Sequence, residues 1–199
     1  MRLTDVYGTH ARRLAAQYET ITFEETHRDV LHLFPVEPRR VLDVGAGSGR
    51  DAAALAARGH TVIAVEPTAE MRKEGQRIHA GSDITWIDDG LPELAVIRGR
   101  AEPFDLIMLT AVWMHLDVDE RVRAMRHLGD LLAGQGRIIM SLRHGPIPEG
   151  RLLFEVTAAE TAELAASVGL DLVHSSERAD MLGRDEVTWS FLAFQRNAR

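Results

Sequence analysis

Residues 41–49 read Val41-Leu42-Asp43-Val44-Gly45-Ala46-Gly47-Ser48-Gly49, an apolar run that passes into three alternating glycines. The run predicts a short buried strand, and the glycines predict a tight turn, because glycine adopts positive φ angles without steric cost. Residues 51–58 are rich in alanine, so we expect a helix there. A helix that starts behind such a turn offers free N–H groups and a positive dipole end to a ligand.

Strands and helices alternate along the rest of the chain. Apolar or β-branched runs predict six further strands, at residues 61–65, 84–87, 104–110, 137–142, 170–174 and 187–194. Helices are expected at residues 68–80, from Asp117 to a C-cap at Gly134, and at 157–168. Residues 187–194 alternate between two faces, which favours a hairpin with the preceding strand. We therefore expect an α/β fold in three layers, with a doubly wound, mostly parallel seven-stranded sheet whose last strand is antiparallel.

The first 38 residues have a helical pattern. Thr22 and Glu25 form a predicted capping box, and proline ends the segment at Pro35. Apolar side chains then fall on one helical face at Phe23, His27, Val30, Leu31 and Phe34. We expect one domain over residues 1–199, in which residues 1–38 form a helical cover and residues 39–199 form the core. The Pro- and Gly-rich stretch 143–156 is expected to be a functional loop.

Composition excludes several classes of function. The 199 residues include no cysteine, which removes disulfides, thiolate metal sites and a cysteine nucleophile. The net charge of −7 argues against general binding of nucleic acid or an anionic membrane, although a local basic patch stays possible. No signal peptide or run of 18 apolar residues is visible, so the expected location is the cytoplasm. No His-x-x-x-His pattern or carboxylate cluster suggests a metal site.

The spacing of the glycines distinguishes between cofactors. A dinucleotide-binding turn has its third glycine three residues after the second, and Arg50 occupies that place. The pattern here is instead an acid at Asp43 followed by Gly45, Gly47 and Gly49, which resembles motif I of the class I S-adenosylmethionine (SAM)-dependent methyltransferases. The resemblance implies that the Asp43 carboxylate binds the ammonium of SAM. It also implies that the turn, with Ala46, lies against the cofactor.

Further positions resemble the family in order and spacing, over about residues 40–142. Glu66 and Pro67 end the second strand, 17 residues after Gly49, where the family's acid binds the ribose hydroxyls. After the third strand the resemblance implies an adenine contact from Asp88 or, as second choice, Asp89. Met71 is a candidate contact for the edge of the adenine ring. Thr110, at the end of the fourth strand, is a further candidate cofactor contact. The alternatives are structural, since Asp89-Gly90 favours a turn and a helical methionine often belongs to the core. Ala133 and Gln135 depart from the family's usual Pro-Gly-Gly turn.

Residues near the same edge of the sheet are candidates for the methyl acceptor. Trp113 and His115 follow the fourth strand, and Arg143 and His144 follow the fifth. His115 and His144 are candidate general bases, while Tyr18, Trp113 and Arg143 are candidate substrate contacts. Tyr7, like Tyr18, belongs to the N-terminal cover, which in enzymes similar to this family folds over the cofactor. Each of these side chains has an alternative role in packing or in stabilising a loop.

The resemblance implies direct transfer of a methyl group from SAM, with S-adenosylhomocysteine (SAH) as product, to an O, N, S or C atom of an acceptor. Thr110-Ala111-Val112-Trp113 stands where nucleic-acid amino methyltransferases carry Asn/Asp-Pro-Pro-Tyr/Phe, so a small-molecule acceptor is expected and nucleic acid is not. A protein acceptor, a non-catalytic SAM- or SAH-binding regulator, and an NAD or nucleotide-sugar enzyme are the alternatives. The acceptor and the oligomeric state stay open at this point.

Overall fold

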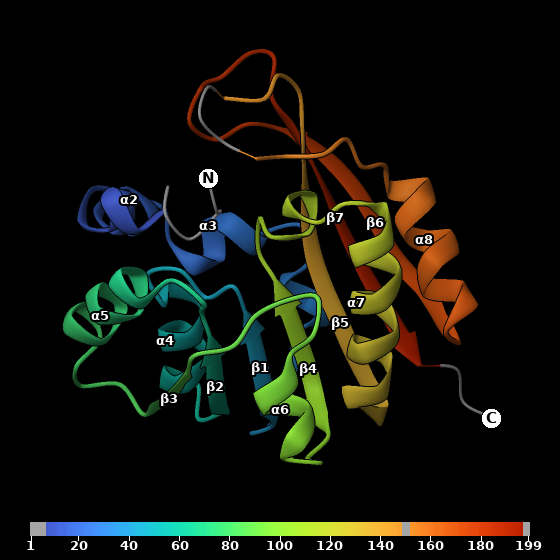
Figure 1. Ribbon diagram of the computed structural model, residues 1–199, viewed down its shortest axis with the longest axis horizontal. Helices are drawn as coiled ribbons and strands as arrows, with labels where there is room; N and C mark the ends of the chain where they lie inside the picture. The colour runs from blue at the N-terminus through green and yellow to red at the C-terminus, as the bar shows by residue number, and fades with distance from the viewer. Residues whose placement is uncertain (1–6, 149–151, 197–199) are drawn as a thin grey trace.

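The computed structural model describes residues 7–148 and 152–196. Its centre is a seven-stranded sheet in the order β3-β2-β1-β4-β5-β7-β6 (Figure 1). The strands are β1 Arg40–Val44, β2 Thr61–Val65, β3 Ile84–Ile87, β4 Phe104–Leu109, β5 Leu132–His144, β6 Leu170–Ala179 and β7 Thr188–Arg196. The pairs among β1 to β5 are parallel, and β7 is antiparallel to both β5 and β6. The predicted fold class, including the antiparallel last strand and its hairpin, is confirmed.

Helices cover both faces of the sheet, which gives three layers. Two separate apolar clusters, one on each face, contain buried residues of the helices. One face is covered by α3 Phe23–His27, η1 Leu31–Leu33 and α4 Arg50–Ala57, and the other by α6 Ala95–Gly99, η2 Trp113–His115, α7 Val118–Leu131 and α8 Ala158–Ser167. α2 Ala11–Tyr18 packs against α5 Ala69–Ile78 beyond the carboxyl ends of the strands (Figure 1). Among the described residues, no helix is long and apolar enough to span a bilayer.

The central strands are buried on both faces, which explains their unbroken apolar sequence. In β4, Leu106 and Met108 join one cluster, whereas Ile107 and Leu109 join the other. All four are fully buried. Burying one such side chain stabilises the fold by about 1.5–3 kcal/mol, so this sheet is a rigid support for the loops at its edge.

The N-terminal cover is less regular than the helical pattern predicts. The Thr22–Glu25 capping box is present, but α3 ends at His27. The chain then continues through i to i+3 bonds, from Val30 N to His27 O and from Leu33 N to Val30 O. These tighter turns still bring Phe23, Val30 and Phe34 into one buried cluster, so the apolar face was correct and the continuous helix was wrong.

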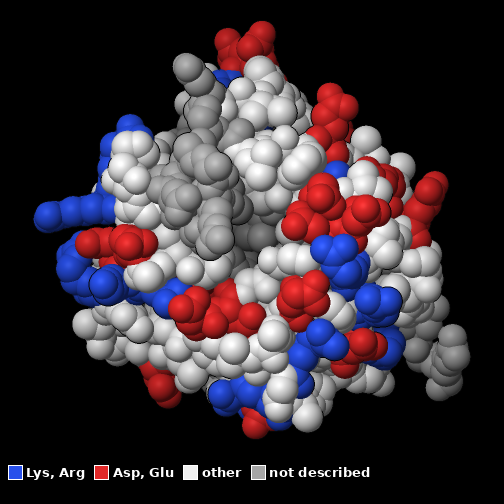
Figure 2. Space-filling model, viewed as in Figure 1, with Lys and Arg blue, Asp and Glu red and all other residues white. Residues whose placement is uncertain are grey.

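Two other predictions about elements were wrong. Gly134 does not cap α7, because that helix passes directly into β5 at Leu132 and Gly134 lies inside the strand, beside a register shift opposite Phe104. β6 extends to Ala179, beyond the predicted end at residue 174. Residues of β7 alternate between the two faces as predicted, with Phe191 and Ala193 in one apolar cluster and Leu192 and Phe194 in the other. Residues 190–194 are all buried because both faces are covered and β7 lies between β5 and β6. On the face seen in Figure 2, acidic and basic side chains lie interspersed.

Candidate functional site

A cavity of about 480 Å³ lies at the carboxyl ends of β1, β2, β4 and β5. In a doubly wound sheet this edge, where the strand order reverses between β1 and β4, is the usual ligand site. The N-terminal cover contributes Tyr7, Tyr18, Ile21 and Thr26 to the wall. The volume is in the range of small-molecule sites.

The glycine turn forms one wall of the cavity. Gly45, Gly47 and Gly49 have φ angles of +70°, +56° and +85°, as the sequence predicts. A Cβ atom added to Gly45 would lie 2.5 Å from Val112 Cγ2, so only glycine fits at that position. Gly45, Ala46 and Gly47 line the cavity, whereas Gly49 lies at the N-cap of α4 with Trp86 against it.

Asp43 lines the cavity at the end of β1 and is 2% exposed. Its Oδ2 has no hydrogen-bond partner among the described residues. Burial, together with the charges of Asp51 and Glu66, raises the pKa of Asp43 well above its ordinary value. A buried carboxylate oxygen without a partner is costly, so this site favours a cationic ligand that restores the missing interaction.

Glu66 is held rigidly at the end of β2. Its Oε2 accepts a hydrogen bond from Gly47 N at 3.0 Å, and its Oε1 accepts one from Thr68 N at 2.9 Å. Burial raises the pKa of Glu66 above its ordinary value. Glu66, Pro67 and Met71 all line the cavity, and each carboxylate oxygen has a further lone pair for a ligand.

Neither acid after β3 lines the cavity. Asp88 forms an ion pair with Arg72 at 2.8 Å, and its side chain is 69% exposed. Asp89 accepts hydrogen bonds from Gly90 N and Ile97 N, so its carboxylate stabilises the turn and the start of α6. The next two residues, Gly90 and Leu91, line the cavity instead.

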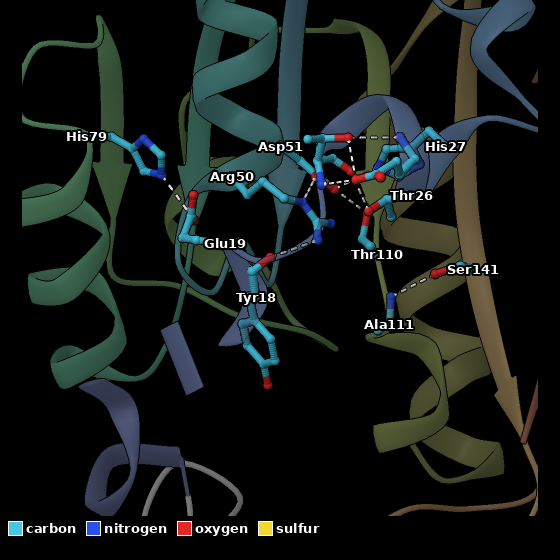
Figure 3. A network of polar contacts seen from close by, with 12 residues as sticks. Tyr18, Glu19, Thr26, His27, Arg50, Asp51, His79, Thr110, Ala111 and Ser141 are labelled. Carbon is cyan, nitrogen blue, oxygen red and sulfur yellow. Dashed lines mark hydrogen bonds and ion pairs between the residues drawn. The ribbon is translucent and has the colours of Figure 1, made fainter. Parts of the chain in front are cut away.

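A buried polar network surrounds Asp51 (Figure 3). Its Oδ2 lies 2.8 Å from His27 Nε2 and accepts a hydrogen bond from Thr110 Oγ1 at 2.7 Å, while its Oδ1 accepts one from Arg50 Nε at 2.7 Å. Burial alone would raise the pKa of Asp51, but His27 and Arg50 hold it far below its ordinary value. Thr110, a predicted cofactor contact, lines the cavity with its hydroxyl committed to Asp51.

Sequence reasoning missed His27, Arg50 and Asp51 as parts of this site. Arg50 and Asp51 lie in the first turn of α4, where an acid is expected for its effect on the helix dipole alone. The sequence signal that could have identified Arg50 and Asp51 was their position directly after Gly49. His27 had been identified only as a member of an apolar helical face.

His115, a candidate base, also lines the cavity. His115 Nδ1 lies 2.9 Å from the carbonyl oxygen of Leu152, and Nε2 lies 3.1 Å from the Tyr7 hydroxyl. A carbonyl only accepts hydrogen bonds, so Nδ1 carries the proton in the neutral ring and Nε2 is the basic nitrogen. Both Tyr7 and His115 line the cavity, and Tyr18 lies against Gly47.

The remaining residues predicted to contact the acceptor lie in different parts of the structure. Trp113 is fully buried in the apolar core and does not line the cavity. His144 Nε2 lies 2.7 Å from Ser190 Oγ and faces a second hollow of about 500 Å³. Arg143 lines both hollows. The sequence missed the contribution of the β6–β7 hairpin, which adds Asp180, Met181, Leu182, Arg184, Trp189 and Phe191 to the wall.

Comparison with known proteins agrees with this geometry. Residues 41–136 match the family model described as methyltransferase domain. A protein-L-isoaspartate O-methyltransferase of Stenotrophomonas maltophilia is 38% identical over 133 residues, which cover 61% of this chain and 56% of that protein. The chain spans about half the length of the curated relatives it matches.

Two solved structures share the fold. A TehB-like SAM-dependent methyltransferase from Corynebacterium glutamicum superposes with a TM-score of 0.72 at 20% identity, covering 95% of this chain and 99% of that one. The Burkholderia thailandensis 1,6-didemethyltoxoflavin-N1-methyltransferase, with bound 1,6-didemethyltoxoflavin and SAH, gives a TM-score of 0.68 at 23% identity, covering 94% and 79%. Residues 41–136 of this chain thus match the methyltransferase domain family, and the chain shares the fold of these SAM-dependent methyltransferases.

Within the described part of the chain, no group of three or more His, Asp or Glu side chains has an arrangement that could hold a metal ion.

Proposed function

We propose that the chain binds SAM in the 480 Å³ cavity and transfers its methyl group to a small-molecule acceptor. The observation that carries this proposal is Asp43, a buried carboxylate on the cavity wall with an oxygen that lacks a partner among the described residues. A ligand with an ammonium group and a neighbouring sulfonium supplies the positive charge that this oxygen favours. NAD carries no ammonium to do so.

The other wall residues fit the rest of that ligand. The Glu66 carboxylate, held by two backbone N–H groups, accepts hydrogen bonds from the ribose hydroxyls. The φ angles of Gly45 and Gly47 keep the turn free of side chains, so the ligand approaches the backbone closely. Met71, Gly90 and Leu91 form the wall for the adenine ring, in place of a carboxylate contact from Asp88 or Asp89.

When bound, SAM supplies an electrophilic methyl group, so the protein contributes mainly alignment and proton removal. His115 Nε2, with its lone pair fixed toward Tyr7 and the cavity, takes the proton of the acceptor nucleophile. His144 bonds to Ser190 and lies outside this cavity, so His115 is the preferred base. Tyr18 and Arg143 line the wall and orient the acceptor, whereas Trp113 supports the wall from the core.

A small-molecule acceptor is favoured by the walls around His115. Leu116, Leu153, Met181, Leu182 and Trp189 contribute apolar surface to the wall of the cavity. The Burkholderia thailandensis enzyme that shares the fold has the small molecule 1,6-didemethyltoxoflavin bound together with SAH.

The proposal is tested by calorimetric titration with SAH and with NAD, followed by an acceptor screen that measures SAH formation from SAM. Binding of SAH and turnover with a small planar acceptor are expected. Binding of NAD and not SAH would overturn the cofactor assignment. SAH binding without turnover on any acceptor would favour a regulatory protein, and turnover only on an isoaspartyl peptide would favour a protein acceptor.

A further inference from the structure

The basic nitrogen of His115 already has a partner in the structure. His115 Nδ1 donates a hydrogen bond to the carbonyl oxygen of Leu152 at 2.9 Å, so the neutral ring carries its lone pair on Nε2. The Tyr7 hydroxyl lies 3.1 Å from that nitrogen. Because a lone pair only accepts, Tyr7 is the donor of this hydrogen bond. A molecule in the cavity therefore reaches the base through the hydroxyl of Tyr7.

The segment behind His115 fixes the direction of the imidazole. Leu152 accepts the bond from His115 Nδ1, and Phe154 N donates a second bond to the carbonyl oxygen of Met114 at 2.8 Å. These two bonds connect residues 152–154 with η2 and keep Nε2 turned toward Tyr7. A backbone carbonyl thereby decides which imidazole nitrogen is basic, as is usual for histidine in proteins.

Tyr7 joins this pair from the N-terminal cover. Its ring meets the His115 ring edge-on, with the centroids 5.7 Å apart and an angle of 85° between the planes. Both side chains line the cavity. A phenolic hydroxyl donates and accepts at the same time, so Tyr7 can bind His115 and accept a proton from a ligand. The two residues, 108 positions apart in the chain, form one path for a proton from the cavity to the imidazole.

We propose that Tyr7 is the catalytic residue that touches the acceptor and that it relays the acceptor's proton to His115. This inference rests on the proposed function, and it adds the group that stands between the acceptor and the base. It also narrows the class of acceptor to molecules whose nucleophilic atom carries a weakly acidic proton, such as a ring hydroxyl or a ring N–H.

The proton transfers balance with the transfer of the methyl group. The acceptor gives its proton to Tyr7 Oη while the proton of Tyr7 moves to His115 Nε2. The electron pair freed on the acceptor atom forms the bond to the methyl carbon, and the carbon–sulfur bond breaks with its pair left on the sulfur of SAH. Tyr7 ends as a neutral phenol. His115 ends as an imidazolium, which the Leu152 carbonyl stabilises at Nδ1.

Two phenols of different acidity test the relay. At mildly alkaline pH para-nitrophenol is ionised and needs no base, whereas phenol keeps its proton. Tyr7→Phe removes the hydroxyl and keeps the ring contact with His115. It is expected to slow methylation of phenol about 100-fold, the lower limit for general acid–base catalysis, and to leave the rate on para-nitrophenol within about twofold. A loss of packing alone would slow both reactions alike.

A double variant distinguishes a relay from two independent groups. If Tyr7 and His115 act as one unit, Tyr7→Phe combined with His115→Gln is expected to lose no more rate on phenol than either single variant. Independent contributions would multiply. The matched control is Thr20→Val, which removes an exposed hydroxyl of the same cover that bonds to the Gln17 carbonyl at 2.7 Å and does not line the cavity. This control is expected to leave both rates unchanged.

Nitrogen NMR of the histidine rings detects the pair without any acceptor. Long-range nitrogen–proton spectra are expected to show the proton of neutral His115 on Nδ1. The Nε2 resonance is expected to move in Tyr7→Phe, because its hydrogen bond is lost. The resonances of His144, whose Nε2 lies 2.7 Å from Ser190 Oγ, are expected to stay in place. Circular dichroism checks each variant, and if Tyr7→Phe does not fold, the tautomer of the wild type decides.

The outcomes separate the inference from the proposed function. A rate loss confined to phenol, with no further loss in the double variant, supports the relay. Equal losses on both phenols, unchanged rates, or a proton on Nε2 overturn the relay and leave the proposed function standing. If SAH binds and neither phenol is methylated, an Nε2 resonance that moves in Tyr7→Phe supports the inference, and one that does not move overturns it. If SAH does not bind, the proposed function is overturned and the inference with it.

Discussion

We propose that the cavity has a cofactor end, formed by residues 43–71, and an acceptor end around His115, and the two are built in different ways. In the cofactor end, Asp43 lies in β1, Glu66 directly follows the adjacent strand β2, and Gly47 N donates a hydrogen bond to Glu66. The acceptor end gathers Tyr7, His115, Leu152 and the β6–β7 hairpin from distant parts of the chain. Its wall residues Leu152 and Leu182 are 51% and 44% exposed, whereas Asp43 and Glu66 are below 10%. The comparison indicates a rigid cofactor end and an acceptor end whose shape depends on how loops pack.

The largest effect is expected at the cofactor end. Asp43→Asn removes the charge that binds the ammonium, which corresponds to about 3–5 kcal/mol and a loss of SAH affinity of more than 100-fold. Because the folded-state pKa of Asp43 is raised, its ionised form costs stability above that pKa. The Asn variant is therefore expected to have a higher Tm without ligand. Calorimetry and thermal unfolding measure both changes, and a lower Tm with unchanged SAH affinity would refute the role of Asp43.

The second effect concerns catalysis at the acceptor end. His115→Gln removes the basic nitrogen and is expected to lower kcat about 100-fold, the lower limit for a general base. SAH affinity is expected to stay within about twofold, because His115 is proposed to act on the acceptor and not on the cofactor. The matched control is His144→Gln, whose side chain bonds to Ser190 away from this wall. If both variants retain full turnover, neither histidine is the base.

A third, smaller effect tests whether the two ends are independent. Asp180 binds Arg184, the Trp189 indole and Leu182 N, and it thereby organises the hairpin that covers the acceptor end. Asp180→Ala is expected to cost about 1–2 kcal/mol locally and to raise amide exchange in residues 180–189 about tenfold. SAH affinity is expected not to change. A large loss of SAH binding would mean that the hairpin also supports the cofactor end.

The smallest effect is a pH dependence of binding. Burial raises the pKa of Asp43, so below that pKa the ligand-free carboxyl is protonated and must release its proton when a cationic ligand binds. SAH affinity should therefore fall as the pH falls below the raised pKa, by at most about tenfold per pH unit. Calorimetry in buffers of different ionisation enthalpy measures the released proton. The same titration of Asp43→Asn should show no such release from this position, and equal release from both proteins would assign the proton elsewhere.

The sequence predicted the part of the site whose residues lie close together in the chain or at the ends of consecutive strands. Asp43 and the glycines occur within seven residues, and Glu66 ends the next strand, so the order of elements was enough to bring them together. Asp88 and Asp89 could not be separated from turn residues in this way, because an Asp-Gly turn and a ligand contact have the same sequence pattern. The structure assigns Asp89 to the start of α6 and Asp88 to Arg72.

By itself, the sequence determined the sheet, its alternation with helices, the antiparallel last strand and the glycine turn, because strand burial and glycine φ angles depend on nearby residues. Only the tertiary structure showed which charged and polar side chains contact one another. His27 reaches Asp51 over 24 positions, and Tyr7 reaches His115 over 108. Such contacts depend on how the N-terminal cover packs across the sheet edge, and hydrogen bonds formed over these separations leave no periodic signal in the chain.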